Sequence, residues 1–152
     1  MSFVDPGPLE PMVGDPDDHR PNSRWRLVVD PGDEAGRVDG LALLVEQIAV
    51  GDRIPLHTHP TDELIVFTQG EGQVRLGEGR RRVAAGTSVF VPAGTPHGTT
   101  NVGSRPLELN AVFPTTVVEI AMLERNPAPG TEDELPRRTR YDFRTGAFEI
   151  LE

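Results

Sequence analysis

The sequence predicts an all-β domain, a sandwich or barrel of short strands joined by tight turns. Gly (16) and Pro (15) together make up about a fifth of the 152 residues. This share is well above average, and both residue types interrupt helices and mark turns. Runs rich in β-branched and aromatic residues also recur at intervals of about 8–12 residues, as in sandwiches and barrels. The chain length fits one domain with one modest core.

Six runs in the middle of the chain are predicted to be strands. The first two flank a Pro-Gly-Asp turn, and Gly- or Pro-containing turns separate most of the others. The predicted strands cover residues 25–29, 41–50, 64–68, 73–76, 87–91 and 107–113. Residues 117–123 are expected to form either a last strand or a short helix. Little helix is therefore expected in the chain.

The two ends of the chain are polar and are expected to extend from the barrel. Residues 1–23 contain five Pro and few apolar side chains, which is typical of an extended, partly disordered arm. Residues 24–123 are predicted to form the barrel. Residues 124–152 are rich in Pro and charge, and we expect this tail to pack on the barrel or on a partner subunit.

The charge pattern argues against nucleic acids and membranes as partners. The formal net charge is −9 and no basic stripe is present, so nucleic-acid binding is not expected. No apolar run approaches the roughly 18 residues of a membrane span, and the first residues are acidic, unlike a secretory signal. We therefore expect a cytoplasmic protein that binds neither nucleic acid nor a membrane.

Cysteine and lysine are both absent from the chain. Neither a thiolate nucleophile nor a lysine Schiff base can therefore form, and disulfides are excluded. A metal ion is the cross-link that remains available to such a sequence.

Three histidines and one glutamate are spaced so that they can meet at one point. His57 and His59 are two residues apart, so both imidazoles face the same side of a strand. Pro60 cannot donate to a strand ladder and should end that strand, so that Glu63 begins the next one. His97 follows a Pro-Ala-Gly turn that can re-aim the chain toward the same point. Such a group is costly to bury without a partner, and a divalent cation is the simplest partner.

These residues belong to two longer patterns in which the sequence resembles the cupin family. The first pattern is met at Gly51, His57, His59, Glu63 and Gly70, and the second at Gly86, Pro92, Gly94, His97 and Asn101. No position departs from either pattern, and the resemblance covers about residues 41–113. It implies a double-stranded β-helix, or jelly-roll, barrel with one divalent metal ion inside its mouth. It also implies a homodimer, since members of this family usually pair.

The four predicted ligands leave the identity of the ion open among Fe, Mn, Ni, Zn and Cu. Three neutral imidazoles and one carboxylate around a divalent ion give a net charge of about +1, which attracts anionic or enolisable oxygen ligands. An octahedral ion with four protein ligands keeps open positions, and catalysis requires open positions.

Alternate residues of a strand face opposite sides of its sheet, so two different sets of residues could line the cavity. If Glu63 faces inward, Ile65 and Phe67 do so too. In residues 107–113 the inward set is either apolar or contains Asn110 as a polar contact. The first set is Leu107, Leu109, Ala111 and Phe113, and the second is Glu108, Asn110 and Val112.

Other polar and aromatic residues have simpler expected roles. One of Glu46 and Gln47 must face inward or lie near a rim, and the sequence does not choose between them. His19, Trp25 and Tyr141 lie outside both patterns and are expected to be surface or packing residues. Arg80 to Arg82 are expected to form a solvated charge run on a hairpin edge.

The leading functional hypothesis is a mononuclear metal enzyme that acts on a small oxygen-bearing organic molecule. Glu63 could double as general base when its bond to the ion loosens. The resemblance implies either a dioxygenase, hence an oxidoreductase, or a cyclase, isomerase or lyase. The alternative is a non-catalytic, metal-dependent binding or sensor module.

Overall fold

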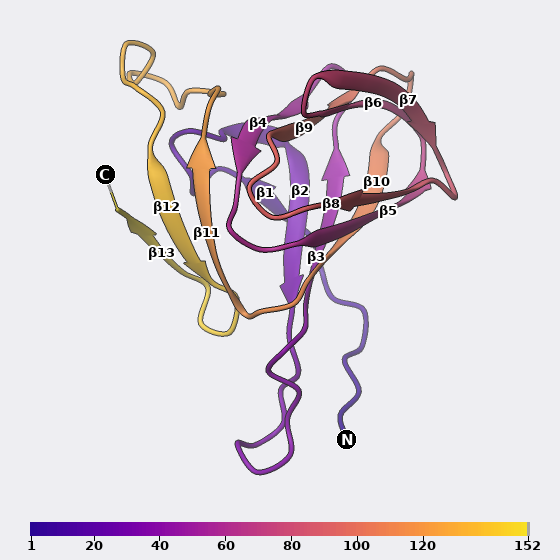
Figure 1. Ribbon diagram of the computed structural model, residues 1–152, viewed down its shortest axis with the longest axis vertical. Coiled ribbons are helices and arrows are strands. Elements are labelled where there is room, and N and C mark those ends of the chain that lie inside the picture. Colours follow the sequence, from indigo (N-terminus) through magenta and orange to yellow (C-terminus); the bar gives the residue numbers. More distant parts are fainter. Residues whose placement is uncertain (152) are drawn as a thin grey trace.

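The computed structural model describes residues 1–151, and all of its regular structure in this range is β-strand (Figure 1). Within this range no helix is long and apolar enough to cross a membrane. The strands are β1 (Glu10–Met12), β2 (Arg20–Val28), β3 (Ala42–Ile48), β4 (Arg53–Thr58), β5 (Glu63–Gln69), β6 (Glu71–Leu76), β7 (Gly79–Ala84), β8 (Ser88–Val91), β9 (His97–Asn101), β10 (Leu107–Phe113), β11 (Val117–Met122), β12 (Arg138–Asp142) and β13 (Ala147–Ile150).

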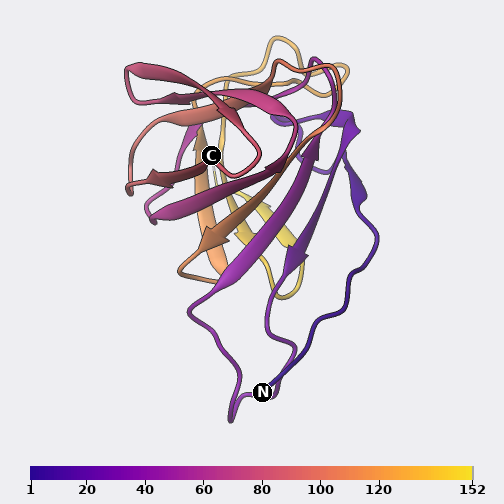
Figure 2. The ribbon, with the colours of Figure 1, turned by 90° about the vertical axis from the view of Figure 1, so that its right-hand side faces the viewer.

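The strands form two sheets in which neighbouring strands run antiparallel (Figures 1 and 2). One sheet has six strands in the order β1-β2-β3-β10-β5-β8, and the other has seven in the order β13-β12-β11-β4-β9-β6-β7. Consecutive strands often lie in different sheets, as β3 and β4 do. This alternation between two sheets is the jelly-roll arrangement that the sequence predicted.

Strand β10 shows how the sequence places the core. It lies between β3 and β5, with Leu107 opposite Ile48 and Val112 opposite Leu64. Leu107, Leu109, Ala111 and Phe113 are at most 4% exposed, whereas the residues between them are half-buried. Burial thus alternates residue by residue along β10, and the apolar set is the one that faces inward. Asn110 therefore faces away from the core.

Tight turns hold the strands in register. Gly70 joins β5 to β6 at a φ of 86°, and an added Cβ there would lie 2.6 Å from the carbonyl oxygen of Pro106. Only glycine fits both conditions. Asn101 ends β9, and its amide donates to the carbonyls of Ile48 and Arg105 while its oxygen accepts from Gly103 N–H. Asn101 is thus the turn side chain that links the two sheets.

The ends of the chain contain more strand than the sequence patterns indicate. β2 begins at Arg20, inside the segment expected to be an arm, and β1 pairs with it. Residues 117–122 form a strand, which resolves the choice between strand and helix. The C-terminal tail contributes β12 and β13, which extend the seven-stranded sheet beyond β11.

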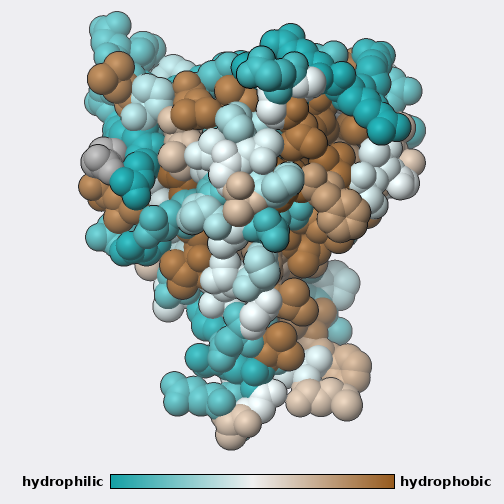
Figure 3. Space-filling model, viewed as in Figure 1, coloured by the Kyte–Doolittle hydropathy of each residue, from teal (hydrophilic) through white to brown (hydrophobic). Residues whose placement is uncertain are grey.

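The edge of the seven-stranded sheet that β7 forms is strongly polar. Arg80, Arg81 and Arg82 lie on β7, the edge strand, and are exposed. Figure 3 shows hydrophilic residues along the upper right of the molecule, where β6 and β7 lie in Figure 1. An edge covered by charge resists pairing with strands of other chains.

Candidate metal centre

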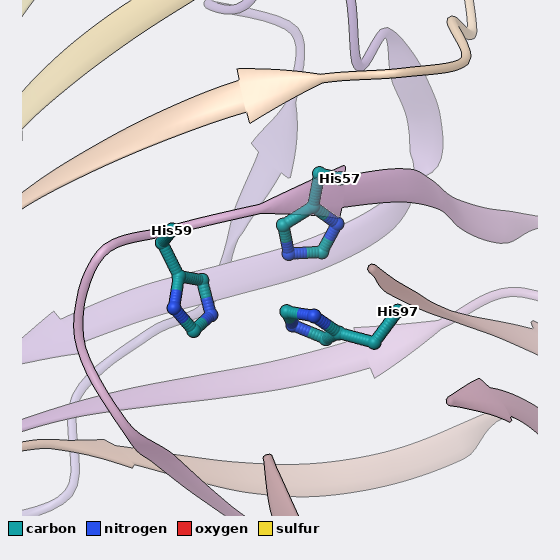
Figure 4. Close-up of side chains that lie close together, drawn as sticks. All are labelled: His57, His59 and His97. Carbon is teal, nitrogen blue, oxygen red and sulfur yellow. The ribbon is translucent and has the colours of Figure 1, made fainter. Parts of the chain in front are cut away.

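Two strands and one turn bring the three histidines together (Figure 4). His57 lies near the end of β4, and His97 begins β9 directly opposite it in the antiparallel register. β4 ends at Thr58, and His59 follows in the turn that leads to Glu63, the first residue of β5. The expected break near Pro60 is therefore present. The same turn carries His59 back toward the other two rings.

The three histidines form a cluster, and Glu63 contacts two of them. Oε2 of Glu63 lies 3.0 Å from Nε2 of His59 and 2.9 Å from Nε2 of His97. The rings of His57 and His97 have centroids 4.2 Å apart. One ring nitrogen from each histidine lies within 4.8 Å of the others, close enough for the three to hold a metal ion.

Backbone carbonyls orient all three imidazoles. Nδ1 of His57, His59 and His97 lies 2.8, 2.7 and 2.8 Å from the carbonyl oxygens of Pro55, Thr61 and Thr95. A carbonyl oxygen only accepts, so each Nδ1 carries the proton and donates it. In the neutral rings Nε2 then carries the lone pair. Second ring nitrogens held in this way are usual around bound metals.

The donor set fits a cation. With Nδ1 protonated, a hydrogen bond from Nε2 to Glu63 needs a second proton on that ring. Without this proton, lone pairs would face a carboxylate oxygen at 2.9 to 3.0 Å, which is repulsive unless a cation lies between them. Two donors bound at about 2.1 Å and at right angles lie about 3.0 Å apart, so the observed spacing suits ligands of one ion.

Burial and the mutual contacts set the charges of the group. Burial is the main reason why the pKa of His57 is lowered to about 4, so this ring is neutral and able to ligate at neutral pH. Burial alone would raise the pKa of Glu63, but the contacts with His59 and His97 outweigh it and hold the pKa at about 2. The group therefore offers an ionised carboxylate and a neutral imidazole, the protonation states that metal binding requires.

The histidines and Glu63 open onto a largely apolar cavity of about 810 Å³, mouth included. A concave, mostly apolar cavity with a few polar groups is typical of small-molecule sites. The apolar walls come from both sheets and are lined by Trp25, Leu27, Leu44, Ile54, Ile65, Leu109, Ala111, Phe113, Ile120, Met122 and Phe143. Phe67 is 1% exposed and belongs to the core beside the cavity.

The structure decides the open choice between Glu46 and Gln47, and it adds cavity residues that have no signal in the sequence patterns. Glu46 lines the cavity, whereas Gln47 binds Glu108 on the other face of the sheet. Arg20 lines the cavity from the expected arm, and Tyr141 from the expected tail. Neither of these two segments shows a periodicity that could have revealed them.

The two-sheet barrel and the histidine cluster in its cavity define a jelly-roll protein with a candidate metal centre. The family model described as "Cupin domain" matches residues 44–113, which include His57, His59, Glu63 and His97. The chain belongs to the cupin superfamily.

Three similar proteins illustrate the relationship. The uncharacterized protein YrkC of Bacillus subtilis is 33% identical over 73 residues, which cover 43% of this chain and 39% of that protein. The dimethylsulfoniopropionate lyase DddQ of Ruegeria pomeroyi is 37% identical over 62 residues, 40% of this chain and 31% of the lyase. The solved structure of the polyketide cyclase RemF of Streptomyces resistomycificus matches with a TM-score of 0.62 and 22% identity over 84% of this chain and 82% of the cyclase.

The extent of these matches limits what they establish. The chain spans half or less of the length of the curated relatives that it matches. At 22% identity, the match to RemF shows a shared fold. The similarity to RemF therefore establishes the barrel fold, and the family assignment rests on the match at residues 44–113.

Proposed function

We propose that the protein is a mononuclear, divalent-metal-dependent enzyme that acts on a small molecule with an apolar body and one or two oxygen atoms. The observation that supports this proposal is the contrast within the cavity. Three imidazoles form a cluster, the Glu63 carboxylate contacts two of them, and the surrounding walls are largely apolar. A ligand of this cavity presents oxygen to the cluster and hydrocarbon to the walls.

The ligands in this proposal are His57, His59, Glu63 and His97, and the ion is one of Fe, Mn, Ni, Zn or Cu. When bound, such an ion supplies Lewis acidity, which polarises a carbonyl or hydroxyl oxygen of the substrate. The carbonyls that accept the three Nδ1 protons fix the orientation of the rings, and Nε2 of each ring would be free to hold such an ion.

Glu63 has the catalytic role in the proposal. Its carboxylate takes a proton from the carbon next to the polarised carbonyl, and the electron pair of the broken C–H bond moves toward the carbonyl oxygen. Return of the proton to another carbon completes an isomerisation, and loss of a leaving group completes an elimination. A cyclisation is completed when the freed electron pair attacks a second carbonyl carbon of the same molecule and the oxygen of that carbonyl takes up the proton. The apolar walls exclude water from this step.

Two relatives favour this non-oxidative chemistry over the dioxygenase alternative. DddQ is named as a lyase and RemF as a cyclase. A dioxygenase and a non-catalytic binding module are the other two outcomes of the test described next.

The test combines metal analysis with turnover. Elemental analysis of anaerobically purified protein identifies the ion. Protein loaded with each candidate metal is then incubated with β-diketones, α-keto acids and flavonols, and both oxygen uptake and products are measured. Product formed without oxygen uptake, and lost in Glu63→Gln but not in His19→Ala, is the expected result. Oxygen uptake would identify a dioxygenase instead, and tight binding without turnover would identify a binding module.

A further inference from the structure

The cavity has a second polar group that neither motif contains. Arg20, the first residue of β2, and Glu46 on β3 line the same cavity as the histidines. Glu46 is opposite Leu109 on β10, whereas Glu63 lies level with Phe113, four residues further along that strand. Four residues of a strand span about 13 Å. The second polar group is therefore displaced along the strands from the histidine cluster.

Arg20 is held from two sides but keeps one donor free. Its Nε and Nη2 donate to the two carboxylate oxygens of Asp18 at 2.7 and 2.8 Å, and Nη2 also pairs with Glu46. The side chains of Arg20 and Glu46 are each 2% exposed. Within residues 1–151, Nη1 of Arg20 has no acceptor. Leaving a buried guanidinium donor unsatisfied is costly, so an acceptor from a ligand would be stabilising there.

The charge balance selects the kind of acceptor. With both carboxylates ionised, Asp18, Arg20 and Glu46 together carry one net negative charge. Burial raises the pKa of Glu46 while the Arg20 guanidinium opposes this rise, and protonation of Glu46 would make the trio neutral. In neither state is the trio positive. A carboxylate or phosphate is therefore not attracted to Nη1, whereas an uncharged carbonyl or hydroxyl oxygen is suitable.

We propose that Arg20 is a ligand-binding residue whose Nη1 donates a hydrogen bond to an uncharged carbonyl or hydroxyl oxygen at the end of the substrate distant from the histidines. This inference rests on the proposed function and adds the substrate class. The substrate has an oxygen function at each end of an apolar body, and the end that meets Arg20 is uncharged.

Calorimetric titration of the zinc-loaded protein tests this assignment. The probes are benzohydroxamic acid, which binds divalent ions through two oxygens, its meta- and para-acetyl derivatives, and its para-carboxylate derivative. We expect at least one acetyl derivative to bind about tenfold more tightly than the parent compound, and the carboxylate to bind no more tightly than the parent.

Two variants and a control separate ligand binding from a structural role. Arg20→Met removes the donor, and Arg20→Met/Glu46→Leu replaces the buried ion pair by apolar side chains, a change that often preserves folding. In both variants the parent compound should bind as before and the acetyl preference should disappear. Arg53→Met is the matched control. Arg53 also forms an ion pair, with Glu124 at 2.7 Å, but it is not among the residues that line the cavity, so its loss should leave the preference intact.

The outcomes distinguish this inference from the function on which it rests. An acetyl preference that survives in the Arg20 variants, or an equal gain for the carboxylate, overturns the role of Arg20. Binding of the parent without any acetyl preference in the unmodified protein overturns it too, while leaving the metal centre intact. If the parent does not bind at all, the metal centre fails and this inference fails with it.

Discussion

Substitution of two of the three clustered histidines should abolish stabilisation of the fold by metal ions. His57 and His97 lie opposite each other on β4 and β9, and both face Glu63 and His59. The double substitution His57→Ala/His97→Ala leaves one imidazole and one carboxylate, too few donors to retain an ion inside the barrel. Neither residue belongs to the apolar core cluster.

The size of the effect follows from linkage. An ion that binds only the folded state stabilises it by about 2.7 kcal/mol when its free concentration is a hundred times its Kd. For a domain of this length, 1 kcal/mol corresponds to a shift of roughly 2–4 °C in Tm. The unmodified protein should therefore gain about 5–11 °C on loading, and the double variant about 0 °C.

Thermal unfolding followed by circular dichroism, with a chelator and then with each candidate metal, measures this gain. Elemental analysis of the same samples gives the bound ion. His19→Ala is the matched control, because His19 lies outside the cluster and its loss should leave the gain intact. Equal gains and equal ion contents in the double variant and the unmodified protein would refute the assignment of the metal centre.

Three further predictions follow from contacts elsewhere in the structure. Burial, followed by the negative charge of Asp15, raises the pKa of Tyr141, so this single tyrosine should stabilise the fold below about pH 10 and lose that contribution as pH rises further. Its phenolate absorbance should thus appear together with unfolding, and its appearance near pH 10 with unchanged circular dichroism would contradict the buried contact. Asn101→Ala removes three hydrogen bonds and should lower the free energy of unfolding by about 1–3 kcal/mol, measured by urea denaturation, with an unchanged midpoint counting against the linking role of Asn101. We also expect a homodimer, with Phe90 exposed on the edge strand β8 as a candidate contact, and a monomer mass in light scattering would exclude it.

The barrel and the candidate ligands could be predicted because their determinants are local. His57 and His59 share one strand face, Glu63 follows after a proline, and turn glycines mark the ends of the strands. The strand predicted at residues 107–113 matches β10 because it is central and alternates strictly between buried and half-buried positions. In such segments the chain itself carries the period that the fold uses.

The ends of the chain could not be predicted because their contacts are distant in sequence. Asp17 accepts from Arg125, 108 residues away, and Asp18 accepts from Asn126 at the same separation. The Tyr141 hydroxyl donates to Asp15 across 126 residues. A polar, Pro-rich segment has no periodicity to indicate that such partners exist. Its order comes from buried ion pairs and hydrogen bonds that only the folded barrel assembles.

The residues that line the cavity fall into two groups, those inside the segment that matches the family model and those outside it. The histidines and Glu63 lie within the segment that matches the family model, residues 44–113, whereas Arg20, Asp18 and Tyr141 lie outside it. If the proposed function holds, a relative that matches only this segment has counterparts of the candidate metal centre but not of the groups proposed to meet the rest of a ligand. In the proposed function the choice of substrate depends on both, because the ion would bind one end of the molecule and the remaining walls would accept or reject its body. Transplanting residues 12–20 and their partners at 125 and 126 between cupins should consequently alter which molecules bind more than how a bound one reacts.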